Sequence, residues 1–141
     1  LATGSGLAPF LSMLGDLDTW QNYDDIVLAY SARTQAELAY IDKIQELQAG
    51  FGEFVENAAR FHFIPIVTRE EVTCCQHDRL PTLIANGKLE NHATKSLNPE
   101  PSHVMLCGNP QLVDDTKEAL KAKGLTMNRR GVGNIAVENY W

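Results

Sequence analysis

The sequence predicts an α/β fold: a doubly wound, five-stranded parallel sheet with strand order 3-2-1-4-5, covered by helices on both faces. Three observations predict it. Short apolar runs alternate with segments of helical periodicity along the 141 residues. The apolar runs are continuous, as in parallel strands that are buried on both faces. Gly, Asn and Pro residues separate the segments and mark the turns.

The first strand is short. Residues 1–3 read as the end of a strand, and a glycine turn at 4–6 follows directly. The chain starts without Met and shows no signal peptide, so we expect a fragment that is cut within or just after its first strand. A helix is expected next, with Pro9 in its first turn and an apolar stripe formed by Phe10, Leu11, Leu14 and Leu17.

The middle of the chain supplies two more strands. A strand is expected at 26–30, followed by a helix that Thr34 and Glu37 open as a capping box. Another strand is expected at 61–67. Because Pro65 would delete a ladder hydrogen bond of a central strand, we place this strand at a sheet edge. Residues 68–101 are the least regular part, with one short helix around 81–85 and a polar loop at 91–101.

The last part repeats the strand–helix pattern. A buried strand at 104–107 ends at Gly108, and Asn109 and Pro110 supply the cap and first position of a helix. Gly124 is expected to end that helix, and a final strand at 135–140 closes the chain.

The composition of the chain excludes several classes of function. The hydrophobic fraction of 44% and charged fraction of 21% are typical of a globular domain, and no apolar run approaches the roughly 20 residues of a membrane span. The net charge of −6 argues against nucleic acid. Three cysteines fit a reducing cytoplasm better than a disulfide framework. Cys74, Cys75 and His77 lack a second pair at zinc-site spacing, so no metal site is expected.

The glycine turn is a candidate phosphate site. Gly4 and Gly6 would let a pyrophosphate approach the backbone, and Thr3 and Ser5 add hydroxyl donors. A Rossmann fingerprint would have Gly where Pro9 stands. The alternative is a tight strand-to-helix turn that binds nothing.

Arginines near strand ends favour NADP over NAD. Arg33 stands where NAD-binding proteins carry an acid for the ribose 2′-hydroxyl, and Arg69 and Arg79 follow the next strand. We expect the three guanidinium groups to converge on a 2′-phosphate. The alternative is three solvated arginines, or ion pairs with Glu37, Glu70 and Asp78.

The strand end at 107–110 and the C-terminus are candidates for contact with flat rings. Cys107 and Gly108 leave room for a ring to stack, and Asn109 can cap the next helix; Cys107 can equally be a small buried residue. Tyr140 and Trp141 place two aromatic residues at the end of the chain, where they need a flat surface to cover them or pack on this domain itself.

Together these pieces resemble the NADP-binding domain of bacterial-type ferredoxin (flavodoxin)–NADP⁺ reductases. The matching segments follow the family's order: ATGSGLAPFLS at 2–12, AYSARTQAELAY at 29–40, IPIVTRE at 64–70, DRLP at 78–81, HVMLCGNPQLVDDT at 103–116 and VENYW at 137–141. CGNP together with the aromatic ending is far more specific than the glycine turn.

The resemblance implies a role for each candidate residue. Residues 4–9 would hold the pyrophosphate, and the three arginines the 2′-phosphate. Cys107 and Gly108 would border the nicotinamide, and Glu138 would lie near the flavin–nicotinamide site. Tyr140 would lie against the flavin ring, and Trp141 would reach towards the FAD adenine. Cys107, Glu138 and Tyr140 are therefore the candidate catalytic residues.

The resemblance also implies an activity. FAD would exchange hydride with NADP(H) and single electrons with ferredoxin or flavodoxin, in the cytoplasm. The family's flavin-binding domain is absent from this sequence, so residues 1–141 are expected to be the NADP(H)-binding domain and to be inactive alone. Two alternatives are an NADH-dependent reductase component of an oxygenase and a non-enzymatic domain that senses dinucleotides.

Overall fold

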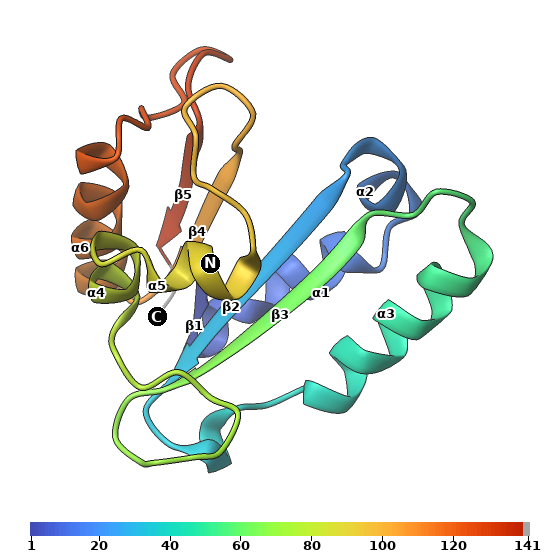
Figure 1. Ribbon diagram of the computed structural model, residues 1–141, viewed down its shortest axis with the longest axis horizontal. Helices are drawn as coiled ribbons and strands as arrows, with labels where there is room; N and C mark the ends of the chain where they lie inside the picture. Colours follow the sequence, from blue (N-terminus) through green and yellow to red (C-terminus); the bar gives the residue numbers. More distant parts are fainter. Residues whose placement is uncertain (140–141) are drawn as a thin grey trace.

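The computed structural model describes residues 1–139 and arranges them around one five-stranded sheet (Figure 1). Its strands are β1 (Ala2–Thr3), β2 (Asp25–Ala32), β3 (Arg60–Val67), β4 (Val104–Gly108) and β5 (Ile135–Asn139). Their order is β3-β2-β1-β4-β5, and each neighbouring pair is parallel. The predicted fold class and strand order are confirmed.

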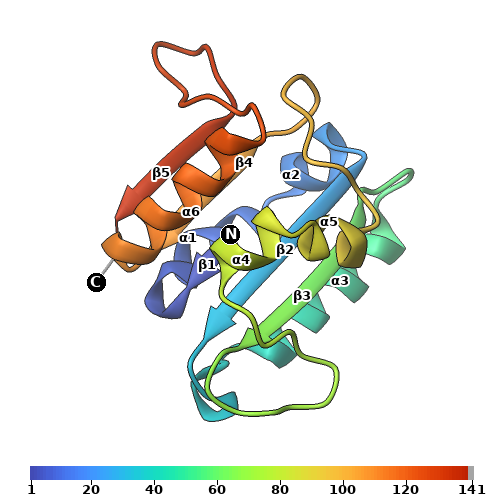
Figure 2. The same cartoon turned by 60° about the vertical axis from the view of Figure 1, so that its left-hand side comes forward.

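Helices cover both faces of the sheet (Figure 2). One layer holds α1 (Ala8–Leu14), α2 (Leu17–Asn22) and α3 (Ile41–Phe54), and the other holds α4 (Leu80–Ala85), α5 (Lys88–Ala93) and α6 (Pro110–Ala122). Two short 3-10 helices, η1 (Gly4–Leu7) and η2 (Gln35–Glu37), follow β1 and β2.

Each face of the sheet has its own buried core. On the first face the indole of Trp20 is buried, stacks on Phe51 at 5.4 Å between ring centroids, and donates its Nε1–H to the Leu14 carbonyl at 2.8 Å. On the second face Leu83 of α4 and Leu120 of α6 are fully buried with residues of the central strands. Apolar side chains on both faces of the strands explain why the strands read as continuous apolar runs.

The edge position of β3 is confirmed, as Pro65 required. Every residue of β3 is in register with β2, from Asp25 opposite Arg60 to Ala32 opposite Val67. On the outer side, the amide of Gln76 donates to the Pro65 carbonyl at 2.9 Å. A loop therefore covers part of this edge.

The first predicted helix is wrong in its length. It ends at Leu14, and Gly15 separates it from α2. Asp16 caps α2 by accepting a hydrogen bond from the Asp18 amide at 3.0 Å, which fixes a new helix start. Leu17, predicted to be buried, is 47% exposed.

The predicted capping box is also wrong. The Thr34 side chain makes no cap, and α3 begins at Ile41 after Tyr40 in the left-handed region (φ 64°). Glu37 binds Arg33 instead. In the segment expected to be irregular, the helix at 80–85 is confirmed, but α5 was not predicted.

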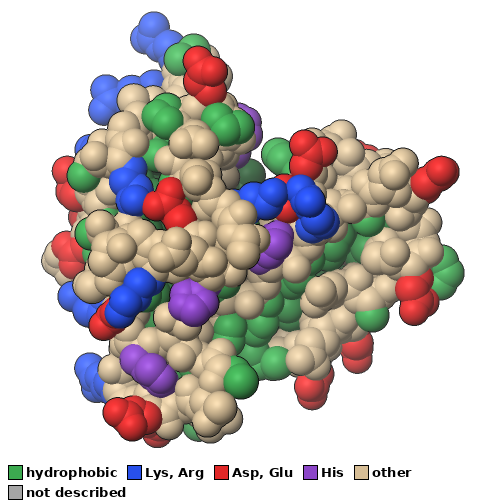
Figure 3. Space-filling view, viewed as in Figure 1, with side chains coloured by type: hydrophobic (Ala, Val, Ile, Leu, Met, Phe, Trp, Pro, Cys, Tyr) green, Lys and Arg blue, Asp and Glu red, His purple; other side chains and the backbone are tan. Residues whose placement is uncertain are grey.

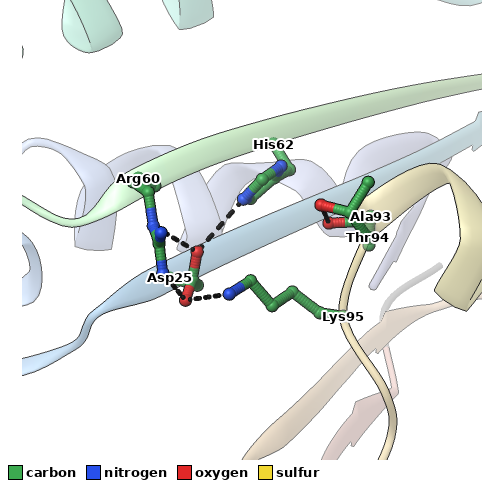
Figure 4. A network of polar contacts seen from close by, with 6 residues as sticks. All are labelled: Asp25, Arg60, His62, Ala93, Thr94 and Lys95. Carbon is green, nitrogen blue, oxygen red and sulfur yellow. Dashed lines mark hydrogen bonds and ion pairs between the residues drawn. The ribbon is translucent and has the colours of Figure 1, made fainter.

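A polar network and a cleft lie at the end of the sheet where the strands begin. The Asp25 carboxylate binds Arg60, His62 and Lys95 (Figure 4). Next to it lies a cleft of about 970 Å³, lined by β2, β4 and the segment that joins α5 to β4. Figure 3 shows the surface of the molecule hollowed in the same region.

Among residues 1–139, no helix is long and apolar enough to cross a membrane.

Candidate functional site

The carboxyl ends of β1 and β4 meet where the order of the strands reverses. The Thr3 hydroxyl oxygen accepts a hydrogen bond from the Asn109 amide at 3.0 Å. Gly108 has a φ of 146°, and a Cβ there would stand 1.9 Å from Thr3 Oγ1. Only glycine lets the two strand ends come this close. In doubly wound sheets, ligands bind beyond the strands at this reversal.

The glycine turn lies directly against this junction. A Cβ on Gly6 would stand 2.3 Å from the Cys107 carbonyl oxygen, so the turn packs on the backbone of β4. Gly4 has a φ of 52°, and a Cβ there would meet nothing within 4 Å. The space beside its Cβ position is therefore open.

The two elements that leave this junction start where the sequence predicts. The Asn109 carboxamide accepts hydrogen bonds from the amides of Gln111 at 3.0 Å and Leu112 at 3.4 Å, so Asn109 caps α6 as expected. Ser5 is exposed in η1, and Pro9 lies in the first turn of α1.

Arg33 follows β2 and is held by one carboxylate. Glu37 Oε1 accepts from Arg33 Nη2 at 2.6 Å, and Glu37 Oε2 accepts from Arg33 Nε and from the Arg33 amide at 3.2 and 3.1 Å. These hydrogen bonds lower the pKa of Glu37 and raise that of Arg33. The pairing with Glu37 that the sequence left open as an alternative is present.

Arg69 lies beside Arg33 through the backbone, because its amide donates to the Arg33 carbonyl at 2.9 Å. The two loops are tied a second time, since the Gln35 amide donates to Glu70 at 2.8 Å. Arg79 precedes α4, and its guanidinium lies 3.5 Å from Asp115 of α6. The structure thus joins the segments of Arg33 and Arg69, while the Arg79 side chain pairs with α6.

Glu70 and Asp78 were possible ion-pair partners of the arginines, but the structure gives both of them other partners. Glu70 accepts from a backbone amide, and Asp78 pairs with Lys88 at 3.0 Å. Sequence reasoning missed Asp115 as the partner of Arg79. The apolar spacing of the helix at 110–122 leaves Asp115 on a polar face, but the spacing does not say which loop that face meets.

Cys107 and Glu138 are neighbours across the sheet. They are in register on β4 and β5, and both line a small cleft of about 170 Å³ beside Pro9 of α1. Burial, and then the nearby Glu138 carboxylate, raise the pKa of the Cys107 thiol. Cys107 is therefore a protonated, buried side chain at neutral pH, which suits packing better than nucleophilic attack. Tyr140 and Trp141 lie outside the described residues.

Other reactive side chains form no further centre within residues 1–139. No group of three or more His, Cys, Asp or Glu side chains there has the arrangement of a metal site. Cys74, Cys75 and Cys107 are free thiols. His62 belongs to the Asp25 network at the opposite end of the sheet, where the strands begin.

Known proteins resemble this chain along most or all of its length. Residues 1–118 match the family described as "Oxidoreductase NAD-binding domain". The flavodoxin/ferredoxin–NADP reductase of Escherichia coli is 38% identical over the whole chain, which covers 55% of that protein. The ferredoxin–NADP reductase of Pseudomonas aeruginosa is 34% identical over 92% of the chain, which covers 50% of it. The chain thus spans about half the length of the curated relatives it matches.

Solved structures show the same relationship. A ferredoxin NADP⁺ reductase from Neisseria gonorrhoeae, solved with bound FAD and NADP, superposes with a TM-score of 0.86 at 34% identity. That superposition covers 98% of this chain and 53% of the other. A flavohemoglobin from Malassezia yamatoensis shares the fold at 17% identity with a TM-score of 0.67. The strand order and these matches show that the chain belongs to the oxidoreductase NAD-binding domain family. It corresponds to the nucleotide-binding part of ferredoxin–NADP reductases.

Proposed function

We propose that the chain binds NADP(H) and presents its nicotinamide to a flavin. The observation that carries the proposal is the junction of Arg33 and Arg69 at the ends of β2 and β3. No acidic side chain stands at positions 31–33, where NAD-binding domains use one for the 2′-hydroxyl. Two guanidinium groups that leave adjacent backbone positions suit the additional phosphate of NADP(H).

The glycine junction suits the pyrophosphate. A Cβ at Gly4 would meet nothing within 4 Å, so a ligand can approach the backbone there. Thr3 and Ser5 add hydroxyl groups beside it. Gly6 and Gly108 keep the two strand ends close enough for one ligand to reach both. We assign the pyrophosphate to residues 3–9 and the 2′-phosphate to Arg33, Arg69 and Arg79. Arg79 would have to leave Asp115 to take part.

The cleft between α1 and β5 suits the nicotinamide. Cys107 and Glu138, which are in register on β4 and β5, both line it, and Gly108 and Asn109 follow Cys107 in the chain. We assign these residues to positioning the ring, and Glu138 to holding a proton or a hydrogen bond at its edge. Tyr140 and Trp141 keep their predicted contacts with the flavin ring and the FAD adenine as part of the proposal.

The intact protein would be a cytoplasmic ferredoxin–NADP⁺ reductase. Bound FAD would supply the chemistry that links hydride transfer with NADP(H) to single-electron transfer with ferredoxin or flavodoxin. This chain's residues contribute binding, orientation and selectivity. The matches to reductases along the whole chain, and the coverage of about half their length, support this assignment.

Cofactor selectivity tests the proposal. We expect the chain to bind NADPH at least tenfold more tightly than NADH, and Arg33→Ala and Arg69→Ala to remove most of that preference. Arg129→Ala is the matched control, because Arg129 is an exposed arginine in the loop before β5. Equal affinities for both nucleotides in every variant would favour an NADH-dependent reductase component instead.

Turnover tests the need for the flavin domain. The purified chain with NADPH and an artificial electron acceptor should show no diaphorase activity. Activity without added flavin domain would contradict the proposal. Turnover that stays absent when a reductase flavin domain is joined to the chain would favour a dinucleotide sensor.

A further inference from the structure

Glu37 occupies the edge of Arg33 that phosphates use. Its two carboxylate oxygens take Nη2 and Nε of the guanidinium in the side-by-side geometry of a bidentate pair. The Arg33 and Glu37 side chains are 63% and 38% exposed, so a ligand in solvent can reach the pair. A phosphate that binds Arg33 by this edge must therefore displace the carboxylate.

The backbone around Glu37 is fixed, so the displacement needs a side-chain rotation, which also releases the bond from the Arg33 amide to Glu37 Oε2. The hydroxyl of the buried Tyr30 donates to the Glu37 carbonyl at 3.2 Å, and the Glu37 amide donates to Thr34 at 3.1 Å. Because Glu37 lies on the short helix η2, its side chain can turn outward while these bonds persist.

We propose that Glu37 is a specificity-determining residue that competes with the cofactor 2′-phosphate for the guanidinium of Arg33. The inference rests on the proposed NADP(H) function. A 2′-phosphate carries close to two negative charges and can replace the carboxylate on Arg33. A ribose 2′-hydroxyl is neutral and cannot. Glu37 therefore weakens binding of the phosphorylated nucleotide and leaves the other unchanged.

Glu37→Gln tests this role directly. The glutamine keeps the length of the side chain but loses its charge and one strong acceptor. We measure dissociation constants of 2′-phospho-AMP and AMP by NMR titration of the 141-residue chain. Glu37→Gln should bind 2′-phospho-AMP about two- to fivefold more tightly, which is the range expected for releasing an exposed ion pair. The AMP affinity should not change.

Two controls separate competition from a change in overall charge. Glu46→Gln removes the same charge from an ion pair with Lys43 on α3 and should change neither affinity. In an Arg33→Ala background, Glu37→Gln should give no gain, because the contested group is gone.

The outcomes distinguish this inference from the proposed function. If wild type prefers 2′-phospho-AMP but Glu37→Gln binds it equally or more weakly, the carboxylate orients Arg33 and competition is wrong. An equal gain for AMP, or a gain that persists without Arg33, also overturns the inference. If wild type does not distinguish 2′-phospho-AMP from AMP, the NADP(H) assignment itself is overturned.

Discussion

The hydroxyl oxygen of Thr3 accepts a hydrogen bond from the amide of Asn109 at 3.0 Å. This bond joins the end of β1 to the first residue beyond β4, where a proposed ligand would cross the sheet. Replacing Thr3 with Val keeps the shape of the side chain but removes the acceptor. We expect the free energy of unfolding to fall by about 1 kcal/mol, measured by urea denaturation.

Thr3→Ser is the matched variant for this bond. It keeps the hydroxyl acceptor for Asn109 and loses only a methyl group. Valine has the higher strand preference, so propensity alone would make Thr3→Val the more stable of the two. A Thr3→Val chain that is as stable as wild type would show that the bond contributes nothing.

Gly6 and Gly50 should respond to alanine with opposite signs. A methyl group at Gly6 would stand 2.3 Å from the Cys107 carbonyl oxygen, which is backbone and cannot rotate away. Gly6→Ala should therefore cost about 1–3 kcal/mol of stability. Gly50 lies inside α3, and its Cβ would meet nothing within 4 Å. Gly50→Ala should gain about 0.5–1 kcal/mol. Equal effects in thermal unfolding would contradict the close approach at Gly6.

The sequence predicts the sheet better than it predicts the helix boundaries. β2 and β4 contain continuous apolar runs, at 26–30 and 104–107, and Pro65 alone places β3 at an edge. The short helix α5 was missed because only Leu89 and Ala93 of its six residues are buried, which leaves no periodic stripe. The start of α3 was misplaced because Glu37 binds Arg33, so it is unavailable for a capping box.

In the candidate site, the positions of the residues can be predicted from the sequence, but the directions of their side chains cannot. Positions at strand ends follow from the order of strands, so the junction of 3–6 with 107–109 and that of Arg33 with Arg69 are predictable from sequence. The direction of a long side chain depends on what surrounds it after folding. Arg79 pairs with Asp115 from another helix, and no local pattern around Arg79 contains that information.

Asp25 should make the stability of the chain depend on pH (Figure 4). Burial alone would raise the pKa of its carboxyl, but hydrogen bonds from Lys95, Arg60 and His62 outweigh burial and lower the pKa well below its ordinary value. A depressed folded-state pKa stabilises the fold at neutral pH, and this contribution is lost as the pH falls below about 4. Asp25→Asn should thus cost about 2 kcal/mol at pH 7, and the difference from wild type should shrink towards pH 2.

Urea denaturation of both chains at several pH values measures this difference. Glu53→Gln on α3 removes an exposed carboxylate and serves as the control, with no comparable loss at pH 7. A gap between wild type and Asp25→Asn that stays constant from pH 7 to pH 2 would mean that the ionised carboxylate does not stabilise the network.

The cleft at the N-terminal ends of the strands should accept a longer β1. Ala2 lies opposite Tyr30, so four residues added before Leu1 would lie opposite 25–28 of β2. The cleft of about 970 Å³ is lined there by Ile26 and Leu28 on one strand and Val104 on the other. Apolar side chains of an added strand would therefore be buried on both faces.

An added Val-Ile-Val-Leu segment should raise the Tm by about 5 °C or more, because it buries apolar area and extends the ladder between β2 and β4. By the alternation of a parallel ladder, the amide of Met105 would gain an acceptor, since the Met105 carbonyl already accepts from Leu1. Hydrogen exchange at Met105 should accordingly slow. A Ser-Asn-Ser-Asn segment of equal length should change neither quantity. Equal Tm values for the two extended chains would show that the cleft does not bind an apolar strand.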